Sequence, residues 1–312
     1  MNRHLDTTDR KQKTLLLTGA SGMLGHYMSE VFHDYRITTL GQGDEADIPC
    51  DLSVATPRLP DDRFDIVVHC AGSRDEQRAR QDNTESTRNL LRSLHDNSPG
   101  AFILVSTTEV YGRSEGENID ETAATFPTSN FGSSKLDAER LSEAAFKDTP
   151  TVLTVLRAAP MFGAGLSGWA QRMFADVLAG RYVHLRGNDS RLSVVTALDV
   201  ARAAKALHPI GGTFNVADGK NPTWLELAEA MSANAGRFHR MATLPPAWAK
   251  ILSRPLSLLP SLCPSLSRQE MERRARTLTF SSDRLREISG LKLYDTIEVI
   301  ARRDPDYPYE DQ

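Results

Sequence analysis

The stretch TGASGMLG (18–25) decides the fold class of this chain. It follows the apolar run KTLLLTG (13–19), which is typical of a buried strand, and it leads into GMLGHYMSEVFHD (22–34), whose amphipathic pattern predicts a helix. A glycine-rich segment between a buried strand and a helix predicts a strand–loop–helix unit, such as opens a parallel α/β sheet.

Gly19, Gly22 and Gly25 follow the spacing GxxGxxG within this stretch. A phosphate group needs close approach to the backbone and free amides at a helix N-terminus, and side chains would obstruct both. We therefore expect the loop to bind the pyrophosphate of a dinucleotide; the alternative is a tight turn whose glycines serve packing. The residues expected to contact the cofactor here are Gly19, Ser21, Gly22, Met23, Leu24 and Gly25.

Apolar and amphipathic runs continue to alternate after this unit. The strand-like runs are almost continuously apolar, which is typical of a parallel sheet with helices on both faces. The sequence thus predicts an α/β fold with a doubly wound, Rossmann-type parallel sheet. Further strands are predicted at 36–40, 64–72, 101–107 and 151–159, and further helices at 83–96 and 133–146.

The character of the sequence changes after Pro160, with clustered glycines, short strands and many prolines. We expect a flexible tail over 1–12, an NAD(P)-binding Rossmann domain over 13–162, and a smaller, mostly helical substrate-binding domain over 163–312. Two segments within about 192–217, LSVVTALDV and GGTFNVADG, are expected to return to the main sheet.

The proline-broken stretch 245–264 contains the richest apolar run of the chain, WAKILSRPLSLLPSL. Arg254 and two prolines interrupt this run, so it does not read as a membrane span. We interpret it as a hydrophobic helix of the substrate-binding domain; a lid, a dimer surface and a membrane-surface contact are the alternatives.

Composition excludes several classes of function. The net charge of −4 and the pI near 6.1 leave no basic face for nucleic acid. The three cysteines, Cys50, Cys70 and Cys263, have neither metal-site nor disulfide-framework spacing. The charged start of the chain lacks the apolar core of a signal peptide. We expect a cytoplasmic protein with reduced thiols, no bound metal, a small-molecule substrate, and neither nucleic acid nor a membrane as partner.

The choice between NAD and NADP is open in the sequence. The second predicted strand ends in LGQG, without the carboxylate that commonly binds the NAD ribose, and no arginine follows to bind the phosphate of NADP. Asp44 and Glu45 lie close behind and are candidates for the ribose, with loop solvation as the alternative. Asp51 and Leu52 would suit the adenine edge, but a helix cap or turn is a nearly equal alternative for Asp51.

Several segments of the chain recur in a known order. They are TGASGMLG, the DL of 51–52, HCAG (69–72), NTESTRNLL (83–91), VSTTEVYG (105–112), FGSSK (131–135) and LRAAPMFG (156–163). Together they resemble the extended short-chain dehydrogenase/reductase family, the NAD-dependent epimerase/dehydratase group, over about residues 13–220. The resemblance implies NAD or NADP as cofactor and a nucleotide-linked sugar, or a related alcohol or ketone, as substrate.

The resemblance also implies roles for single residues. The hydroxyl of the family pattern STxxVYG falls on Thr107. The lysine of YxxxK falls on Lys135; in the family it binds the nicotinamide ribose and lowers the pKa of the tyrosine. Ala71 and Gly72 would line the cofactor cleft, and Pro160, which stands where the family has the asparagine of NVYG, would also lie against the cofactor.

The segment VSTTEVYG is further similar to the sugar-nucleotide 4,6-dehydratases, which carry Thr-Asp-Glu at 107–109. This likeness implies that Glu109 removes a proton next to a new ketone. Thr108 stands where the acid should be, so a full dehydratase cycle lacks one of its groups, and Thr108 is expected to contact the substrate instead.

The tyrosine of YxxxK is replaced by Phe131 in this chain. A positioned phenol speeds proton transfer by a factor on the order of 10² to 10⁴, and a phenyl ring cannot donate, accept or ionise. The candidates to replace the phenol are Thr107, Glu109, Tyr111 and a water bound by Thr107 and Lys135. Alternatively, Phe131 simply packs at a helix start that Ser129 or Asn130 caps.

Two further sites are candidates for substrate binding. Ser73 and Arg74 follow the third predicted strand at its carboxyl end, where doubly wound sheets bind substrates, although a solvated loop arginine is an equal alternative. Arg191, near Arg186, lies about where nucleotide-sugar members of the family bind a diphosphate. His69 is expected to be a core residue.

Two functions follow from these residues. The first is an NAD(P)-dependent epimerase, dehydratase or reductase that acts on a nucleotide sugar or a similar alcohol or ketone. The second is a non-catalytic NAD(P)-binding sensor or partner protein on the same fold, which Phe131, Thr108 and Pro160 favour. A homodimer that pairs through helices at 83–96 and 131–147 is expected from the resemblance.

Overall fold

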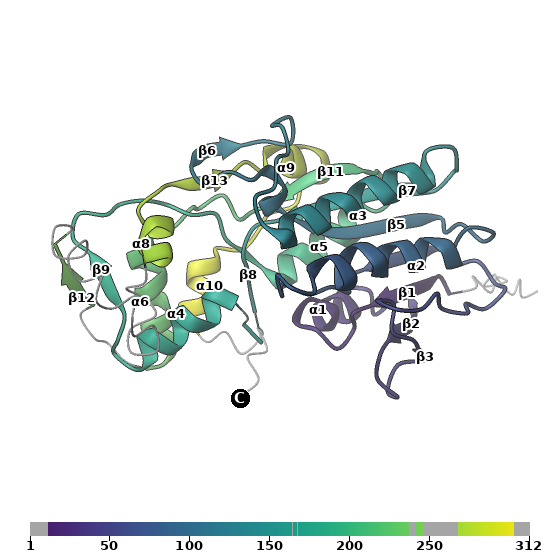
Figure 1. Ribbon diagram of the computed structural model, residues 1–312, viewed down its shortest axis with the longest axis horizontal. Coiled ribbons are helices and arrows are strands. Elements are labelled where there is room, and N and C mark those ends of the chain that lie inside the picture. The colour runs from purple at the N-terminus through teal and green to yellow at the C-terminus, as the bar shows by residue number, and fades with distance from the viewer. Residues whose placement is uncertain (1–11, 164, 167, 237–240, 246–267, 303–312) are drawn as a thin grey trace, which may run out of the picture.

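The computed structural model describes residues 12–163, 165–166, 168–236, 241–245 and 268–302. Within them the chain forms a Rossmann-type part and a smaller part beside it (Figure 1). The tail predicted at 1–12 and the proline-broken stretch 245–264 lie almost wholly outside the described residues. Both therefore stay predictions.

The centre of the Rossmann-type part is a seven-stranded parallel sheet in the order β11-β7-β5-β4-β1-β2-β3. The chain starts in the middle, winds to one edge and then returns to build the other half, which confirms the predicted doubly wound fold. The strands are β1 (Thr14–Thr18), β2 (Arg36–Gly41), β3 (Ile48–Pro49), β4 (Ile66–His69), β5 (Ala101–Thr107), β7 (Val152–Ala158) and β11 (Gly212–Val216).

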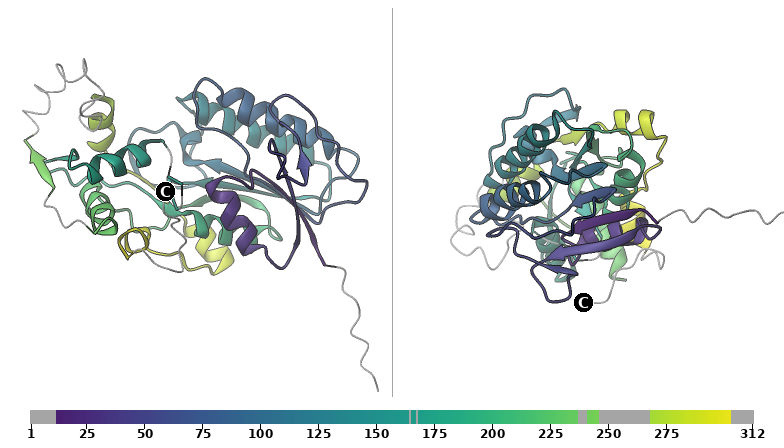
Figure 2. Two further views of the ribbon diagram at one scale, coloured as in Figure 1. Left: turned by 90° about the horizontal axis from the view of Figure 1, so that it is seen from below. Right: turned by 90° about the vertical axis from the view of Figure 1, so that its right-hand side faces the viewer.

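Helices bury both faces of this sheet, as Figure 2 shows from two sides. Helices α1 (Met23–Val31) and α5 (Ala197–Leu207) cover one face, and the π-helical turn η1 (Arg80–Glu85), α2 (Ser86–Ser93) and α3 (Asn130–Phe146) cover the other. Successive side chains of a strand point to opposite faces. Leu15 and Leu17 of β1 accordingly pack in the α1–α5 core, and Leu16 packs in the α2–α3 core.

The smaller part has its own core, built around Phe162, Trp224, Leu227 and Met231. Its elements are α4 (Gly168–Leu178), α6 (Trp224–Asn234), α8 (Arg268–Arg274), α10 (Thr296–Arg302) and the paired strands β9 (Val183–Leu185) and β12 (Ala242–Leu244). The pairs β8 (Met161–Phe162) with β10 (Val195–Thr196), and β6 (Gly116–Ile119) with β13 (Leu278–Phe280), connect the two parts, and α9 (Asp283–Ser289) packs beside β11.

Some predicted boundaries are wrong for local reasons. The helix predicted at 83–96 begins three residues earlier, in η1, and ends at Ser93. The helix predicted at 133–146 begins at Asn130, because the Ser129 hydroxyl caps it by accepting from the Gly132 amide at 2.9 Å. Of the two segments expected in the main sheet, GGTFNVADG supplies β11, whereas LSVVTALDV forms β10 and opens α5.

A buried ion pair fixes α3 against the sheet. Arg157 of β7 lies 2.7 Å from Glu139 of α3, and their side chains are 10% and 2% exposed. Arg157 also donates to Tyr111 Oη at 3.1 Å, and Tyr111 donates to Asn215 of β11 at 2.8 Å. Because an unpaired charge in such a place is costly, this network holds α3 in one position along the sheet.

The close packing of α1 on β1 predicts a difference between two glycines. A Cβ on Gly25 would lie 2.1 Å from the Gly19 carbonyl oxygen, whereas a Cβ on Gly43 would find nothing nearer than 3.9 Å. We expect Gly25→Ala to lower the free energy of unfolding by about 1–3 kcal/mol through overpacking. The control Gly43→Ala should change it by less than about 0.5 kcal/mol. Urea denaturation measures both, and equal stability of the two variants would contradict the packing argument.

Candidate active site

The loop between β1 and α1 leaves the helix N-terminus open. Gly19 has a φ of +75°, and a Cβ there would lie 2.7 Å from the Ala71 amide nitrogen, so only glycine fits. Gly22 caps α1 in extended conformation, no side chain caps the helix, and its first turn has no acidic residue. A Cβ on Gly22 would meet only the Gly19 oxygen, at 3.4 Å. The amides of this turn therefore fit the pyrophosphate that the sequence predicts.

Residues of the predicted adenine end form a hydrogen-bonded turn. The Asp51 carboxylate accepts the Ser53 amide at 2.9 Å, and hydrogen bonds from Ser53 lower the pKa of Asp51. Leu52 is buried, and its carbonyl accepts from Asn89 at 2.9 Å. The structure thus shows the turn role of Asp51, and its contact with adenine stays a prediction. Asp44 and Glu45 are exposed after β2.

His69 is buried in the core, as the sequence predicts, and the structure adds that it belongs to a chain of hydrogen bonds. Burial lowers its pKa to about 3, so the ring is neutral. Its Nδ1 lies 2.7 Å from the Thr18 hydroxyl, which accepts the Ala71 amide, and its Nε2 lies 3.0 Å from the Thr87 hydroxyl. Thr87 in turn donates to the Asn83 carbonyl at 2.7 Å. This chain connects the end of β4 to η1 and α2.

The Asn83 side chain joins the loop after β4 to the start of α3. Its Oδ1 accepts the Ser73 amide at 3.0 Å, and its Nδ2 donates to the Ser73 carbonyl and to Ser134 Oγ, both at 2.9 Å. Ser134 Oγ donates on to the Phe131 carbonyl at 2.8 Å. A Cβ on Gly72 would lie 2.2 Å from Asn83 Oδ1, so this contact also requires the glycine.

Lys135 of α3 lies beside Gly72 and the end of β5. Its side chain is buried, and Nζ donates to the Val105 carbonyl at 2.9 Å. The same Nζ lies 3.3 Å from the place that a Cβ on Gly72 would occupy. Burial lowers the pKa of Lys135 to about 8. The lysine therefore lies between β5 and the loop after β4, and its binding of a nicotinamide ribose stays a prediction.

Phe131 lies one helical turn before Lys135 on α3, and a cation covers its ring. The guanidinium of Arg74 lies over the Phe131 ring, with its carbon 4.7 Å from the ring centroid. Arg74 Nη2 lies 2.5 Å from Glu109 Oε1, and Ser129 donates to the other oxygen of Glu109 at 3.2 Å. The structure thus brings together Phe131, Arg74 and Glu109, which the sequence treats as separate candidates.

The two threonines at the end of β5, Thr107 and Thr108, lie where the strand turns into η2. Thr107 caps the 3₁₀ turn η2 (Thr108–Tyr111), because its hydroxyl accepts the Glu109 amide at 3.2 Å. Thr107 and Thr108 are both buried. Thr107 keeps its own hydroxyl proton for a further hydrogen bond, so its predicted role toward a substrate oxygen stays compatible with this geometry.

Tyr111 is a poor replacement for the missing phenol. Its hydroxyl donates to Asn215 at 2.8 Å and accepts from Arg157 at 3.1 Å, and the ring stacks on Phe280. Burial raises the pKa of Tyr111. Since both hydrogen-bonding functions are occupied and the side chain is 1% exposed, Tyr111 packs structurally.

The remaining predicted residues lie around this group. Pro160 follows β7 and its carbonyl accepts the Val195 amide at 3.1 Å, while Ser73 Oγ accepts the Asp75 amide at 3.0 Å. Arg191 donates to the Asn221 carbonyl at 2.9 Å and lies 4.0 Å from Glu226. Arg191 therefore contacts the start of α6 and its preceding loop, and its role toward a diphosphate stays a prediction.

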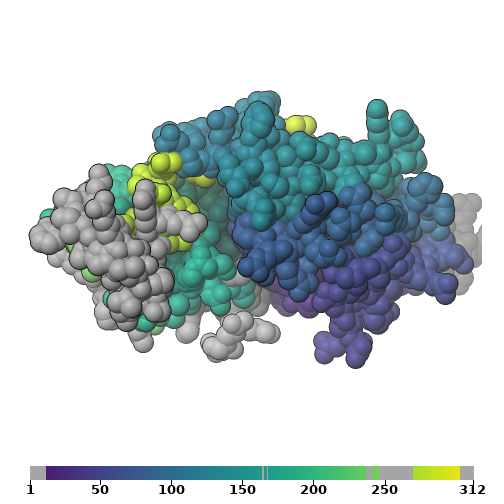
Figure 3. All heavy atoms as spheres, in the orientation of Figure 1, coloured from purple at the N-terminus to yellow at the C-terminus, as the bar shows by residue number. Residues whose placement is uncertain are grey.

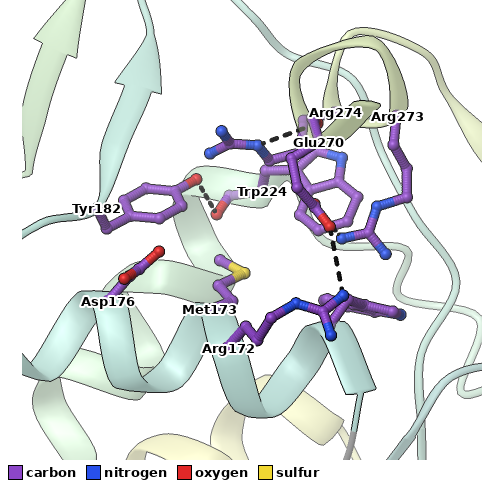
Figure 4. Close-up of a pocket in the computed structure, with 9 residues that line it drawn as sticks. Arg172, Met173, Asp176, Tyr182, Trp224, Glu270, Arg273 and Arg274 are labelled. Carbon is purple, nitrogen blue, oxygen red and sulfur yellow. Dashed lines mark hydrogen bonds and ion pairs between the residues drawn. The ribbon is translucent and has the colours of Figure 1, made fainter. Parts of the chain in front are cut away.

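Sequence reasoning missed a pocket in the smaller part, between α4, α6 and α8 (Figure 4). Arg273 lies over the rings of Trp169 and Trp224, at 4.4 and 5.2 Å from their centroids. Tyr182 donates to the Trp224 carbonyl at 3.2 Å, and the buried Nε1 of Trp224 has no hydrogen-bond partner in the described part of the chain. No motif in the sequence signals this group, because its members meet only through helix packing.

Burial of Lys135 predicts a pH-dependent stability. Its pKa is about 8 in the folded chain against 10.5 for the free side chain, so the unfolded chain binds more protons between these values. The cost of the buried charge is therefore present below pH 8 and is relieved as pH rises. Between pH 7 and pH 10, urea denaturation should show the wild-type chain gaining about 2 kcal/mol relative to Lys135→Met. Parallel stability curves would contradict the buried charge.

Comparison with known proteins places this geometry in a family. Residues 15–217 match the NAD dependent epimerase/dehydratase family. The chain is 27% identical over 238 residues to a probable dTDP-4,6-dihydroxy-2-methyloxan-3-one 4-ketoreductase of Streptomyces antibioticus. The aligned region covers 71% of this chain and 78% of that relative. It is 25% identical over 261 residues to the UDP-glucose 4-epimerase of Vibrio cholerae, with 72% and 77% covered.

Solved structures share the fold over almost the whole chain. The NADPH complex of the protein RMD from Pseudomonas aeruginosa superposes with a TM-score of 0.69 at 22% identity, covering 93% of this chain and 96% of that one. The family match extends from β1 to β11 and includes the glycine loop, Asn83, Arg74, Glu109 and Lys135. The chain therefore belongs to the NAD dependent epimerase/dehydratase family.

Proposed function

We propose that this chain is an NAD(P)-dependent oxidoreductase that acts on an alcohol or ketone of a nucleotide-linked sugar. The observation that carries the proposal is the open N-terminus of α1, where Gly22 leaves the helix amides free, at the same sheet edge as the buried Lys135. The names of two relatives, a ketoreductase of a dTDP-linked compound and a UDP-glucose epimerase, support the substrate class.

Each part of the site has a task in this proposal. The loop amides bind the pyrophosphate, and Lys135 binds the nicotinamide ribose. The bound nicotinamide supplies or accepts the hydride. Thr107 donates a hydrogen bond toward the substrate oxygen, and Ser73 and Arg74 lie on the substrate side of the loop after β4. NAD and NADP remain equal candidates, because no carboxylate or arginine directly follows β2.

A non-catalytic NAD(P)-binding protein is the second candidate. One observation favours it: the ring of Phe131 has no hydroxyl, and Tyr111 is committed to Asn215 and Arg157. The two functions share the cofactor and differ in hydride transfer.

Location and assembly stay predictions. No helix among the described residues is both long and apolar enough to cross a membrane. The helices α2 and α3, blue and teal on the right of Figure 3, are those expected to pair in a homodimer. Their outward side chains include Arg88, Asp137 and Arg140, with ion pairs Arg88–Glu85 and Arg140–Asp137 inside the chain. A dimer through these helices would therefore have a polar interface.

Cofactor binding should depend on the open space at Gly22. Because Gly22 is extended and a Cβ there meets no atom closer than 3.4 Å, Gly22→Val should fold, with a loss of about 1 kcal/mol because valine is a poor N-cap. Its branched side chain would fill the space of the pyrophosphate, so NADH and NADPH should bind at least about tenfold more weakly. Titration of nucleotide fluorescence measures the affinity, and a thermal melt is the control. Unchanged affinity would refute the loop as the cofactor site.

Hydride transfer separates the two candidate functions. We expect the wild-type chain to oxidise bound NADH or NADPH in single-turnover mixing with UDP- and dTDP-linked 4-keto sugars. Stopped-flow absorbance of the reduced nicotinamide follows the step. Normal cofactor binding without transfer to any member of this panel would favour the binding protein over the oxidoreductase.

A further inference from the structure

Arg74 reaches the Phe131 ring from the loop after β4. Its guanidinium carbon lies 4.7 Å from the ring centroid, and Nη2 lies 2.5 Å from Glu109 Oε1. Its Nε lies 3.9 Å from the place that a Cβ on Gly168, at the start of α4, would occupy. Arg74 thus stands between the Rossmann-type part and the smaller part, beside the ring that replaces the family's phenol.

The guanidinium keeps donors available for a ligand. It has five N–H groups, and the contact with Glu109 engages one nitrogen. The side chains of Arg74 and Glu109 are each 39% exposed, so a bound ligand can reach them. A guanidinium stays protonated and is therefore no proton donor or acceptor, but it stabilises negative charge on an oxygen.

Hydrogen bonds fix the backbone of the loop that carries Arg74, although this loop lies at the surface. Ser73 makes two backbone hydrogen bonds with the Asn83 side chain, which also bonds Ser134 of α3. The backbone of the loop is therefore fixed relative to Phe131. Glu109 is fixed as well, because its amide is bound by Thr107 and its second oxygen by Ser129. A preorganised charge of this kind is what electrostatic stabilisation of a transition state requires.

We propose that Arg74 is a catalytic residue, which binds the reacting oxygen of the substrate in place of the missing phenol and stabilises the negative charge on that oxygen during hydride transfer. The proposal rests on the function proposed above. Glu109 is then a positioning residue that holds the guanidinium, and the Phe131 ring is the flat face on which the guanidinium stacks.

The bond changes balance without a phenol. When an alcohol is oxidised, its C–H bond breaks and the electron pair leaves as hydride to the oxidised nicotinamide, the O–H proton passes to water, and the C=O bond forms. When a ketone is reduced, each change is reversed and water returns the proton. Arg74 neither gains nor loses a proton in either direction.

A phenol introduced at position 131 can report the charge at this place without any substrate. Ultraviolet difference titration of Phe131→Tyr against the wild-type chain isolates the added phenol. In that background we expect Arg74→Met to raise its pKa by about one unit or more, because an opposite charge is lost. Glu109→Gln should lower it. The control Arg140→Met removes a 65% exposed charge further along α3 and should leave it unchanged.

An unchanged phenol pKa after Arg74→Met would overturn the proposal, because the guanidinium charge would then not reach the position of the reacting oxygen. A shift of equal size in the Arg140→Met control would overturn it too, since the effect would reflect net charge alone. The titration can refute the proposal even if the natural substrate is not among the UDP- and dTDP-linked 4-keto sugars tested.

Hydride transfer supplies the second readout. In the otherwise wild-type chain, Arg74→Met should slow single-turnover transfer by about a hundredfold or more while NADH and NADPH affinities stay unchanged. Arg74→Lys should recover part of the rate, because it restores the charge but not the planar fork. Transfer at the wild-type rate in Arg74→Met would refute the role. If the wild-type chain bound neither NADH nor NADPH, that result would instead count against the proposed function.

Discussion

One buried amide side chain holds the candidate site together. Asn83 engages both backbone groups of Ser73 and the hydroxyl of Ser134, so all the hydrogen-bonding groups of its amide except one lone pair are in use. Through this contact the loop after β4 and the first turn of α3 become one unit. The unit contains Arg74 on one side and Phe131 on the other, and the position of each therefore depends on the same few hydrogen bonds. A buried polar group with this many hydrogen bonds rigidifies its surroundings.

The electrostatics of the site follow from where the chain buries charge. Lys135 is enclosed, donates to a backbone carbonyl and has a pKa lowered by burial to about 8. Arg74 lies near the surface with its charge shared with Glu109. In family members with a tyrosine at position 131, the lysine acts on a phenol. Here the neighbour of the ring is a second cation, Arg74, and under the proposal above this cation stabilises negative charge on the substrate oxygen.

Much of the fold could be predicted because its signals are local. The glycine loop, the buried strands and the amphipathic helices are each encoded in fewer than about twenty consecutive residues, and a parallel sheet leaves few ways to connect them. Phe131 and Lys135 could also be related in advance, because they stand one helical turn apart. Helix starts were less predictable: the sequence offered Ser129 and Asn130 as caps of α3, and the structure decided for Ser129.

The sequence by itself determined the doubly wound parallel sheet, the glycine loop between its first strand and first helix, and the absence of a phenol at position 131, because residue type and short spacing suffice for these. The tertiary structure alone decided that Arg74 covers Phe131 and binds Glu109. These residues come from the ends of two neighbouring strands and from a helix, and no pattern in the chain links them. Side chains that are far apart in sequence meet only where the sheet brings its carboxyl ends to one edge, and the same holds for Arg273 between Trp169 and Trp224.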